Sequence, residues 1–217
     1  MTDYPIPADD ATHQAYQERE RLVVAARLLY LESGIEAVTK ADIAAAAQLD
    51  APAVDRYFPL GKPALVQAMV ERYLPYVHQN LEQQLETCNN AVEQLLAMRT
   101  FMREEMGQVQ TLFFRDLEAH YFASWQYFLR AQQDFLLAYI RTNLRLGMDQ
   151  QLYRADLDVE FLAQLWLQQI TSLLGPAGTG LPPVDAHYEL LNRFLAGITT
   201  AGGSFVARRL QEGPPYY

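Results

Sequence analysis

The chain has 217 residues, of which 50% are hydrophobic, and a formal net charge of −9. This length and hydrophobic content allow one large or two small domains with real cores, and they argue against disorder over most of the chain. The negative charge argues against a protein that coats nucleic acid or anionic membranes regardless of sequence, because such binding needs surplus lysine and arginine.

Cys88 is the only cysteine, so an intramolecular disulfide is excluded. The N-terminal segment lacks the basic and then apolar order of a signal peptide. No stretch approaches the roughly 20 uninterrupted apolar residues of a membrane-spanning helix. We therefore expect a cytoplasmic protein with no membrane partner.

Apolar residues recur every three or four positions, and no run alternates with period two for long enough to suggest a strand. We therefore predict an all-α fold. Residues 1–11 and 211–217 are expected to be disordered. The first helix is predicted from about Thr12 to Ser33, and it should end at Gly34, which suits a left-handed C-terminal cap.

Two short helices should follow. Thr39 should cap the first, because Asp42 lies three residues later, as in a capping box, and its carboxylate suits the positive end of a helix. Asp50 should start the second, with Pro52 in its first turn, where a missing N–H group costs little. A longer helix should begin near residue 63, and Pro75 either kinks or divides it.

The remaining chain also has helical spacing. Gly147 should interrupt the pattern, Asp158 can cap the helix that follows, and a Gly- and Pro-rich linker over residues 175–185 is the clearest break, because its composition forbids regular helix. The predicted helical stretches are 91–147, as two or three helices, then 158–174 and 185–210.

Residues 21–65 contain small, apolar and aromatic residues in a distinctive order. They are Ala26, Leu29, Tyr30, Gly34, Thr39, Asp42, Ile43, Ala44, Tyr57, Phe58 and Lys62. This order resembles the N-terminal domain of the TetR (tetracycline-repressor-like) family of bacterial transcriptional regulators. The resemblance implies a helix-turn-helix domain over 12–75 and a ligand-binding and dimerisation domain over 76–210. It implies a ligand-responsive homodimer, most simply a repressor, that binds double-stranded operator DNA and a small apolar or aromatic ligand.

In such a domain one short helix enters the major groove while the other braces it, and helix N-termini donate backbone N–H groups to phosphates. Basic side chains would meet phosphates, and small apolar ones could contact a thymine methyl group. The residues expected at the DNA are Thr39, Lys40, Ala51, Ala53, Val54, Arg56, Tyr57 and Lys62. Arg56 and Tyr57 could instead merely close the core of the domain.

Three positions depart from the family pattern. Gln48 stands where the family has glycine, so the turn either strains this residue by about 1 kcal/mol or takes another form. Asp55 replaces an aromatic residue that faces the DNA backbone, and it would repel phosphate. One extra residue before Lys62 could displace that lysine from its phosphate. The alternative function is therefore a helical dimer of the same fold that binds a small molecule or protein partner without DNA.

Aromatic residues are concentrated in the second half of the chain. An aromatic-lined cavity suits an apolar or aromatic ligand, although aromatic side chains at helical spacing also build ordinary cores. The expected ligand-pocket residues are Phe113, Phe114, Tyr121, Trp125, Phe128, Phe135 and Trp166.

The last two predicted helices carry more apolar surface than one supporting layer needs. Dimerisation would cover this surface and would match two reading helices to a two-fold operator. Intramolecular packing is the alternative. The expected interface residues are Phe161, Leu165, Ile170, Leu190, Phe194, Ile198 and Phe205.

Catalysis is not expected. The four histidines are widely separated, and no Cys, His or acidic cluster has metal-ligand spacing. The Gly-rich segment lacks the lysine and strand context of a phosphate-binding loop. We predict no metal, no cofactor and no enzymatic activity.

Overall fold

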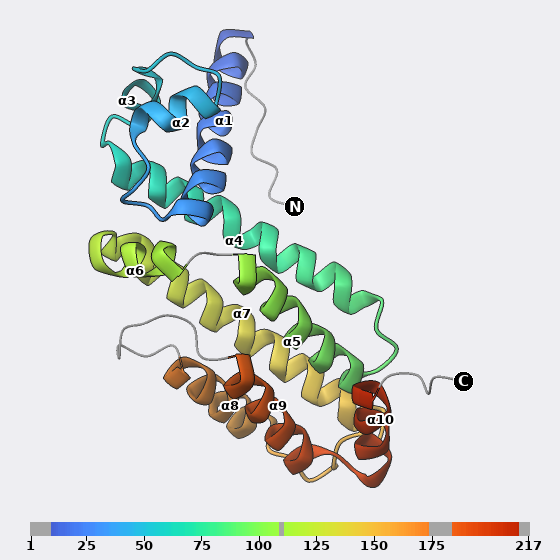
Figure 1. The fold of residues 1–217 in the computed structure, drawn as a ribbon. Helices are drawn as coiled ribbons and strands as arrows, with labels where there is room; N and C mark the ends of the chain where they lie inside the picture. The colour runs from blue at the N-terminus through green and yellow to red at the C-terminus, as the bar shows by residue number, and fades with distance from the viewer. Residues whose placement is uncertain (1–9, 109–110, 174–183, 213–217) are drawn as a thin grey trace. The chain divides into compact units, whose positions relative to one another are not determined.

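The computed structural model describes residues 10–108, 111–173 and 184–212 (Figure 1). These residues are helical and form no strand, which confirms the predicted all-α fold. Most of the two ends expected to be disordered, and most of the expected linker, lie outside the described residues. The helices are α1 (Asp10–Ser33), α2 (Lys40–Ala46), α3 (Ala53–Tyr57), α4 (Lys62–Glu86), α5 (Ala91–Gln108), α6 (Thr111–His120), α7 (Phe122–Asp149), α8 (Val159–Leu173), α9 (Val184–Ile198) and α10 (Ala201–Glu212).

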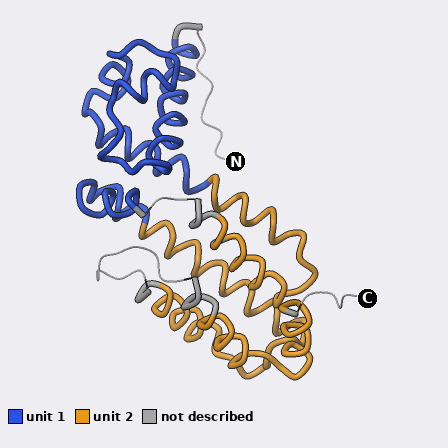
Figure 2. The backbone as a smooth tube through the Cα atoms, viewed as in Figure 1, with its two compact units in different colours: residues 1–75, 109–128 blue, residues 76–108, 129–217 orange. Residues whose placement is uncertain are grey.

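The chain divides into two compact units (Figure 2). Unit 1 comprises Met1–Pro75 and Val109–Phe128, and unit 2 comprises Tyr76–Gln108 and Leu129–Tyr217. The helix α4 runs unbroken through Pro75, and both α4 and α7 contribute to the two units. The segment containing α6, which the sequence placed with the ligand-binding domain, therefore packs with the helix-turn-helix region.

Unit 1 is built around the buried stripe of α1. Leu22, Ala26 and Tyr30 are fully buried, at 0% exposure. At the end of this helix Gly34 takes a φ of 84°, and its N–H donates to the Tyr30 carbonyl at 2.9 Å, so the predicted left-handed cap is confirmed. A side chain at Gly34 would also press on Leu112 and Asp116 of α6, which contacts α1.

Unit 2 has a polar cluster at its centre. Asn143 of α7 is buried, and its amide donates to the Ala91 carbonyl at 2.8 Å and accepts from the Tyr153 hydroxyl at 3.1 Å. The Tyr153 ring lies against Gly147, where a Cβ would come within 2.0 Å of it. Gly147 was predicted to interrupt the helix, but α7 continues to Asp149, so close packing explains the glycine instead.

The predicted final helix over 185–210 is in fact two helices. Thr200 caps the second, α10, by accepting from the Gly203 N–H at 3.2 Å, and its own N–H donates to the Leu152 carbonyl at 2.9 Å. Thr199 forms an isolated antiparallel bridge with Tyr153. These contacts with the loop after α7 break the helix. The predicted cap of α8 is confirmed, since Asp158 accepts from the Phe161 N–H at 3.0 Å.

Candidate DNA-binding interface

The first short helix of the pair has the predicted capping box. The Thr39 hydroxyl accepts from the Asp42 N–H at 3.1 Å, and the Asp42 carboxylate accepts from the Thr39 N–H at 2.9 Å. The hydrogen bonds from Thr39 hold the pKa of Asp42 below its usual value. Ile43 and Ala44 are buried, so α2 is fixed at its start and along one face.

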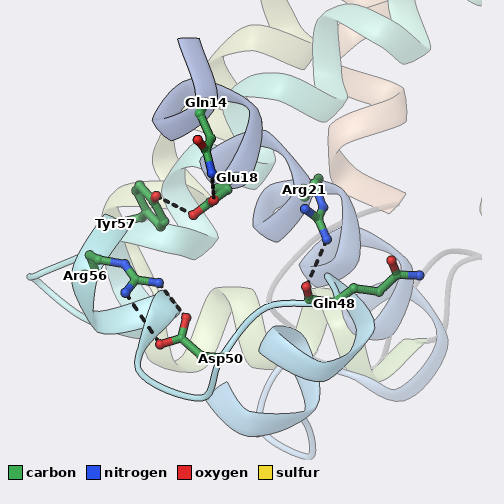
Figure 3. A network of polar contacts seen from close by, with 7 residues as sticks. All are labelled: Gln14, Glu18, Arg21, Gln48, Asp50, Arg56 and Tyr57. Atoms are coloured by element: carbon green, nitrogen blue, oxygen red, sulfur yellow. Dashed lines mark hydrogen bonds and ion pairs between the residues drawn. The ribbon is translucent and has the colours of Figure 1, made fainter. Parts of the chain in front are cut away.

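The turn after α2 keeps its shape without glycine. Gln48 has a φ of 56°, and the turn closes through hydrogen bonds from Gln48 to Ala45 and from Leu49 to Ala44, at 3.0 and 2.9 Å. The sequence left open whether Gln48 is strained or the turn takes another form. The structure shows the first, because Gln48 adopts the left-handed conformation that costs a non-glycine residue energy. Arg21 of α1 donates to the Gln48 carbonyl at 3.0 Å and ties the turn to α1 (Figure 3).

The second short helix begins later than predicted. Its N-terminal cap is Pro52, which supplies no side-chain hydrogen bond, and α3 starts at Ala53. The prediction that Asp50 starts this helix is wrong, because the Asp50 side chain pairs with Arg56 instead, at 2.5 Å. Ala53 and Val54 are fully buried. Their expected contact with bases is therefore replaced by a packing role, whereas Ala51 is exposed.

The exposed side of α2 and α3 carries paired charges. Lys40 donates to the Asp55 carboxylate, and the two side chains are 42% and 63% exposed. Arg56 pairs with Asp50, which raises the pKa of the guanidinium (Figure 3). Each cation expected at a phosphate is thus held by a neighbouring acid. Exposed ion pairs of this kind are weakly held.

Tyr57 joins this face to α1. Its hydroxyl donates to the Glu18 carboxylate at 2.6 Å, which lowers the pKa of Glu18 and raises that of Tyr57. Gln14 donates to the same carboxylate at 3.0 Å (Figure 3). The end of α3 is therefore braced from α1 through a hydrogen bond that sequence spacing does not reveal.

Lys62 lies at the start of α4, after the extra residue. Gly61 takes a φ of 76° in the preceding turn. The Lys62 ammonium lies 3.9 Å from the Glu36 carboxylate and over the ring of Tyr30, and only 20% of its side chain is exposed. Lys62 is therefore directed towards its own domain in the free protein.

Seven arginines and lysines occur in residues 10–75, and each has an intramolecular partner. Besides the contacts above, Arg72 lies 3.3 Å from Glu20, while Arg19 and Arg27 lie over the rings of Phe58 and Tyr73. On the exposed side of α2 and α3, an acid compensates the charge of both Lys40 and Arg56.

The expected pocket residues are divided between the two units. Phe113, Phe114, Tyr121, Trp125 and Phe128 belong to unit 1, where four of the rings contact one another and the Tyr121 hydroxyl donates to Glu36 at 2.8 Å. Phe135 and Trp166 belong to unit 2, where Phe135 stacks on His78 and the ring of Trp166 contacts that of Phe194 at a tilt of 43°. Among the unit 1 residues, Phe113 and Tyr121 are buried, and Phe114, Trp125 and Phe128 are half-buried.

A shallow hollow lies elsewhere in unit 2. Its volume is about 310 Å³, and sequence reasoning gave no signal for it. Burial raises the pKa of the Cys88 thiol in its wall, so this cysteine is not an activated nucleophile. The lining residues are Gln84, Thr87, Cys88, Glu93, Leu96, Ala97, Arg99, Thr100 and Leu210.

The expected interface residues divide by exposure. Phe161 of α8 and Phe205 of α10 are 63% and 58% exposed. Leu165, Ile170 and Leu190 are half-buried. Phe194 and Ile198, also expected at the interface, are buried inside the subunit, where Phe194 packs on Trp166.

Neither a metal site nor a membrane span emerges from the described parts of the chain. No three His, Cys, Asp or Glu side chains there are grouped to hold an ion. None of the helices described has both the length and the apolar character that crossing a bilayer requires.

Residues 22–69 match the family described as "Bacterial regulatory proteins, tetR family". A TetR-family regulator structure from Agrobacterium tumefaciens is 16% identical in sequence and has a TM-score of 0.63. The alignment covers 86% of this chain and 100% of the A. tumefaciens chain. A transcriptional-regulator structure from Saccharomonospora viridis in complex with choline is 21% identical with a TM-score of 0.63, over 85% and 99%. RolR in complex with resorcinol is 19% identical with a TM-score of 0.59, over 95% and 98%.

A comparison with curated proteins gives no match. The solved structures share the fold, and the family match covers the region in which the capping box, the left-handed turn and α3 have been described. Residues 22–69 are therefore similar to the tetR family of bacterial regulatory proteins, and the chain shares its fold with solved regulators of that family.

Proposed function

We propose that this protein is a sequence-specific DNA-binding regulator, most simply a repressor, that acts as a homodimer. The observation that carries this proposal is the intact helix-turn-helix geometry: α2 is capped by Thr39, the turn is held in the left-handed form at Gln48, and α3 is braced by Tyr57. A short helix that its neighbours hold in place is what insertion into a major groove requires.

The charge pairs determine how such a protein would bind. Lys40 and Arg56 are each paired with an intramolecular carboxylate, so general phosphate attraction is small. Binding then depends on contacts that only the correct sequence supplies. A regulator with weak nonspecific binding spends less time on the competing sites of a genome.

Exposed apolar surface in unit 2 supports the homodimer. Phe161 and Phe205 are both more than half exposed, and large aromatic side chains in contact with water favour burial against a partner. Two-fold pairing of unit 2 would present two copies of α3 to a palindromic operator.

Two buried donors in unit 2 support binding of a small organic ligand. The Tyr139 hydroxyl and the Trp166 indole N–H are buried and have no hydrogen-bond partner among the described residues. An unsatisfied buried donor costs about 1–3 kcal/mol, and a ligand acceptor would remove that cost. Similar folds have been solved with choline and with resorcinol. A ligand that prefers one conformation would shift the population of DNA-competent dimers.

A gel shift with duplex DNA from the region upstream of the protein's own gene, run across a salt series, tests the proposal. We expect a discrete complex at low salt that competitor DNA of unrelated sequence does not remove. Arg56→Ala should weaken it, whereas Arg193→Ala, which removes an exposed arginine of α9, should not. The absence of any sequence-specific complex at low salt would refute DNA recognition.

The paired charges also favour a second candidate function. If Asp50 and Asp55 hold Arg56 and Lys40 permanently, the same fold serves as a dimer that binds a small molecule or a protein partner without DNA. The gel shift separates the two functions, because only the first gives a sequence-specific complex.

A further inference from the structure

The outward side of α3 carries a carboxylate at its centre. Val54 and Phe58 are on the buried side of this segment. Asp55 is on the opposite side, and 63% of its side chain is exposed to solvent. Its Oδ1 atom accepts from the ammonium group of Lys40, which extends from the start of α2. Both short helices thus contribute to one charged pair on the side that a helix-turn-helix presents to DNA, where a carboxylate would be repelled by the phosphate backbone and is better accommodated at the base edges of the major groove.

A carboxylate in the major groove is selective about what it meets. It repels phosphates and the acceptor atoms O6 and N7 of guanine, O4 of thymine and N7 of adenine. Cytosine offers a donor, its N4 amino group, with no acceptor beside it on that edge. Adenine offers an amino donor next to its N7 acceptor, so a carboxylate suits adenine less well than cytosine.

Lys40 complements this preference. The guanine paired with a cytosine presents two acceptors, O6 and N7, to the same groove. A carboxylate can accept about four hydrogen bonds through its two oxygens. Asp55 can therefore keep its bond to Lys40 while it accepts from a cytosine, and Lys40 can donate to an adjacent guanine acceptor. The pair then presents an acceptor and a donor side by side, which matches a C·G base pair.

We propose that Asp55 is a specificity-determining residue that accepts a hydrogen bond from the N4 amino group of a cytosine in each operator half-site, with Lys40 donating to the guanine. This inference rests on the proposed DNA-binding function. In this arrangement the acid that opposes nonspecific binding is the residue that selects the site.

Selection from a randomised duplex DNA library by the full-length protein tests this inference. The wild-type protein should enrich cytosine at one position of each half-site by about tenfold over the other bases. Asp55→Asn keeps the size of the side chain but supplies both a donor and an acceptor, which suit the N7 and N6 of adenine. This variant should change the preferred base at that position from cytosine to adenine and leave the other positions unaltered.

Asp149→Asn is the matched control, because it removes the same charge from an exposed site at the end of α7. It should select the wild-type sequence, and unchanged melting temperatures would show that both variants fold. If Asp55→Asn selects the wild-type base, or only binds all sequences more tightly, Asp55 does not read a base and the inference is overturned. If the wild-type protein enriches no sequence at all, the proposed function itself fails.

Discussion

At the scale of single residues, Arg56 decides how much positive charge α3 can offer to DNA. It is half exposed, and Asp50 holds it at 2.5 Å. Asp50→Asn should free the guanidinium for a phosphate, because the amide keeps the shape of the side chain but not its charge. We expect tighter binding to any duplex, with a plot of log affinity against log salt steeper by about 0.9 for one added phosphate contact.

Fluorescence anisotropy with labelled duplex DNA over a salt series measures this slope. Asp149→Asn changes the net charge equally but lies in unit 2, so it should leave the slope unaltered. An equal gain in both variants would mean that total charge, and not the release of Arg56, governs the affinity.

Gln48 stores strain in the turn between α2 and α3. Its φ of 56° is a conformation that glycine adopts without a steric penalty. Gln48→Gly should therefore raise the free energy of unfolding of unit 1 by about 1 kcal/mol, measured by chemical denaturation. Gln151 provides a comparison in unit 2, since it has the same residue type and a φ of 58°.

The two glycine variants should stabilise different units. The free energy of unfolding reported by a fluorescence probe in unit 1 should rise in Gln48→Gly and stay unchanged in Gln151→Gly. A loss of stability in Gln48→Gly would show that contacts of the glutamine side chain outweigh the backbone strain.

At the scale of helices, Gly147 and Gly197 occupy similar positions near the ends of α7 and α9 but differ in surroundings. A Cβ at Gly147 would lie 2.0 Å from the Tyr153 ring, whereas a Cβ at Gly197 meets nothing within 4 Å. Gly147→Ala should lower the free energy of unfolding by about 1–3 kcal/mol through overpacking. Gly197→Ala should raise it by up to about 1 kcal/mol, because alanine favours helix. Thermal unfolding measures both, and a stabilised Gly147→Ala would contradict the packing at Tyr153.

Local signals predicted some helix ends and not others. The caps at Gly34, Thr39 and Asp158 depend on residues within four positions, so sequence spacing was sufficient to find them. The break before α10 depends on Thr200 and the backbone of Leu152, which are 48 residues apart. Periodicity continues across such a break, and it therefore predicted a single helix.

At the scale of the whole molecule, the aromatic residues show what composition cannot reveal. Their number predicts a pocket, and the structure assigns five of the seven expected pocket residues to unit 1. There the buried carboxylate of Asp116 accepts from the Glu36 N–H at 3.0 Å, and Tyr121 donates to the Glu36 side chain. These contacts span 80 and 85 residues. A pattern read along one helix does not show which unit that helix joins.

The proposed dimer makes a prediction about the whole assembly. Phe161 on α8 is 63% exposed in unit 2, and Phe122 at the start of α7 is 72% exposed in unit 1. Phe161→Glu would place a charge in the apolar interface, and a buried charge without a partner is strongly unfavourable. Light scattering after size-exclusion chromatography should therefore give a monomer mass for Phe161→Glu and a dimer mass for the wild-type protein and for Phe122→Glu.

Loss of the dimer should also reduce operator binding, because a monomer gives up the second half-site while its helix-turn-helix remains folded. The circular dichroism spectrum of Phe161→Glu should match that of the wild-type protein. A variant that stays dimeric would place the interface away from α8. A monomer that bound the operator as tightly as the dimer would separate DNA recognition from two-fold symmetry, and each α3 would then have to recognise its site alone.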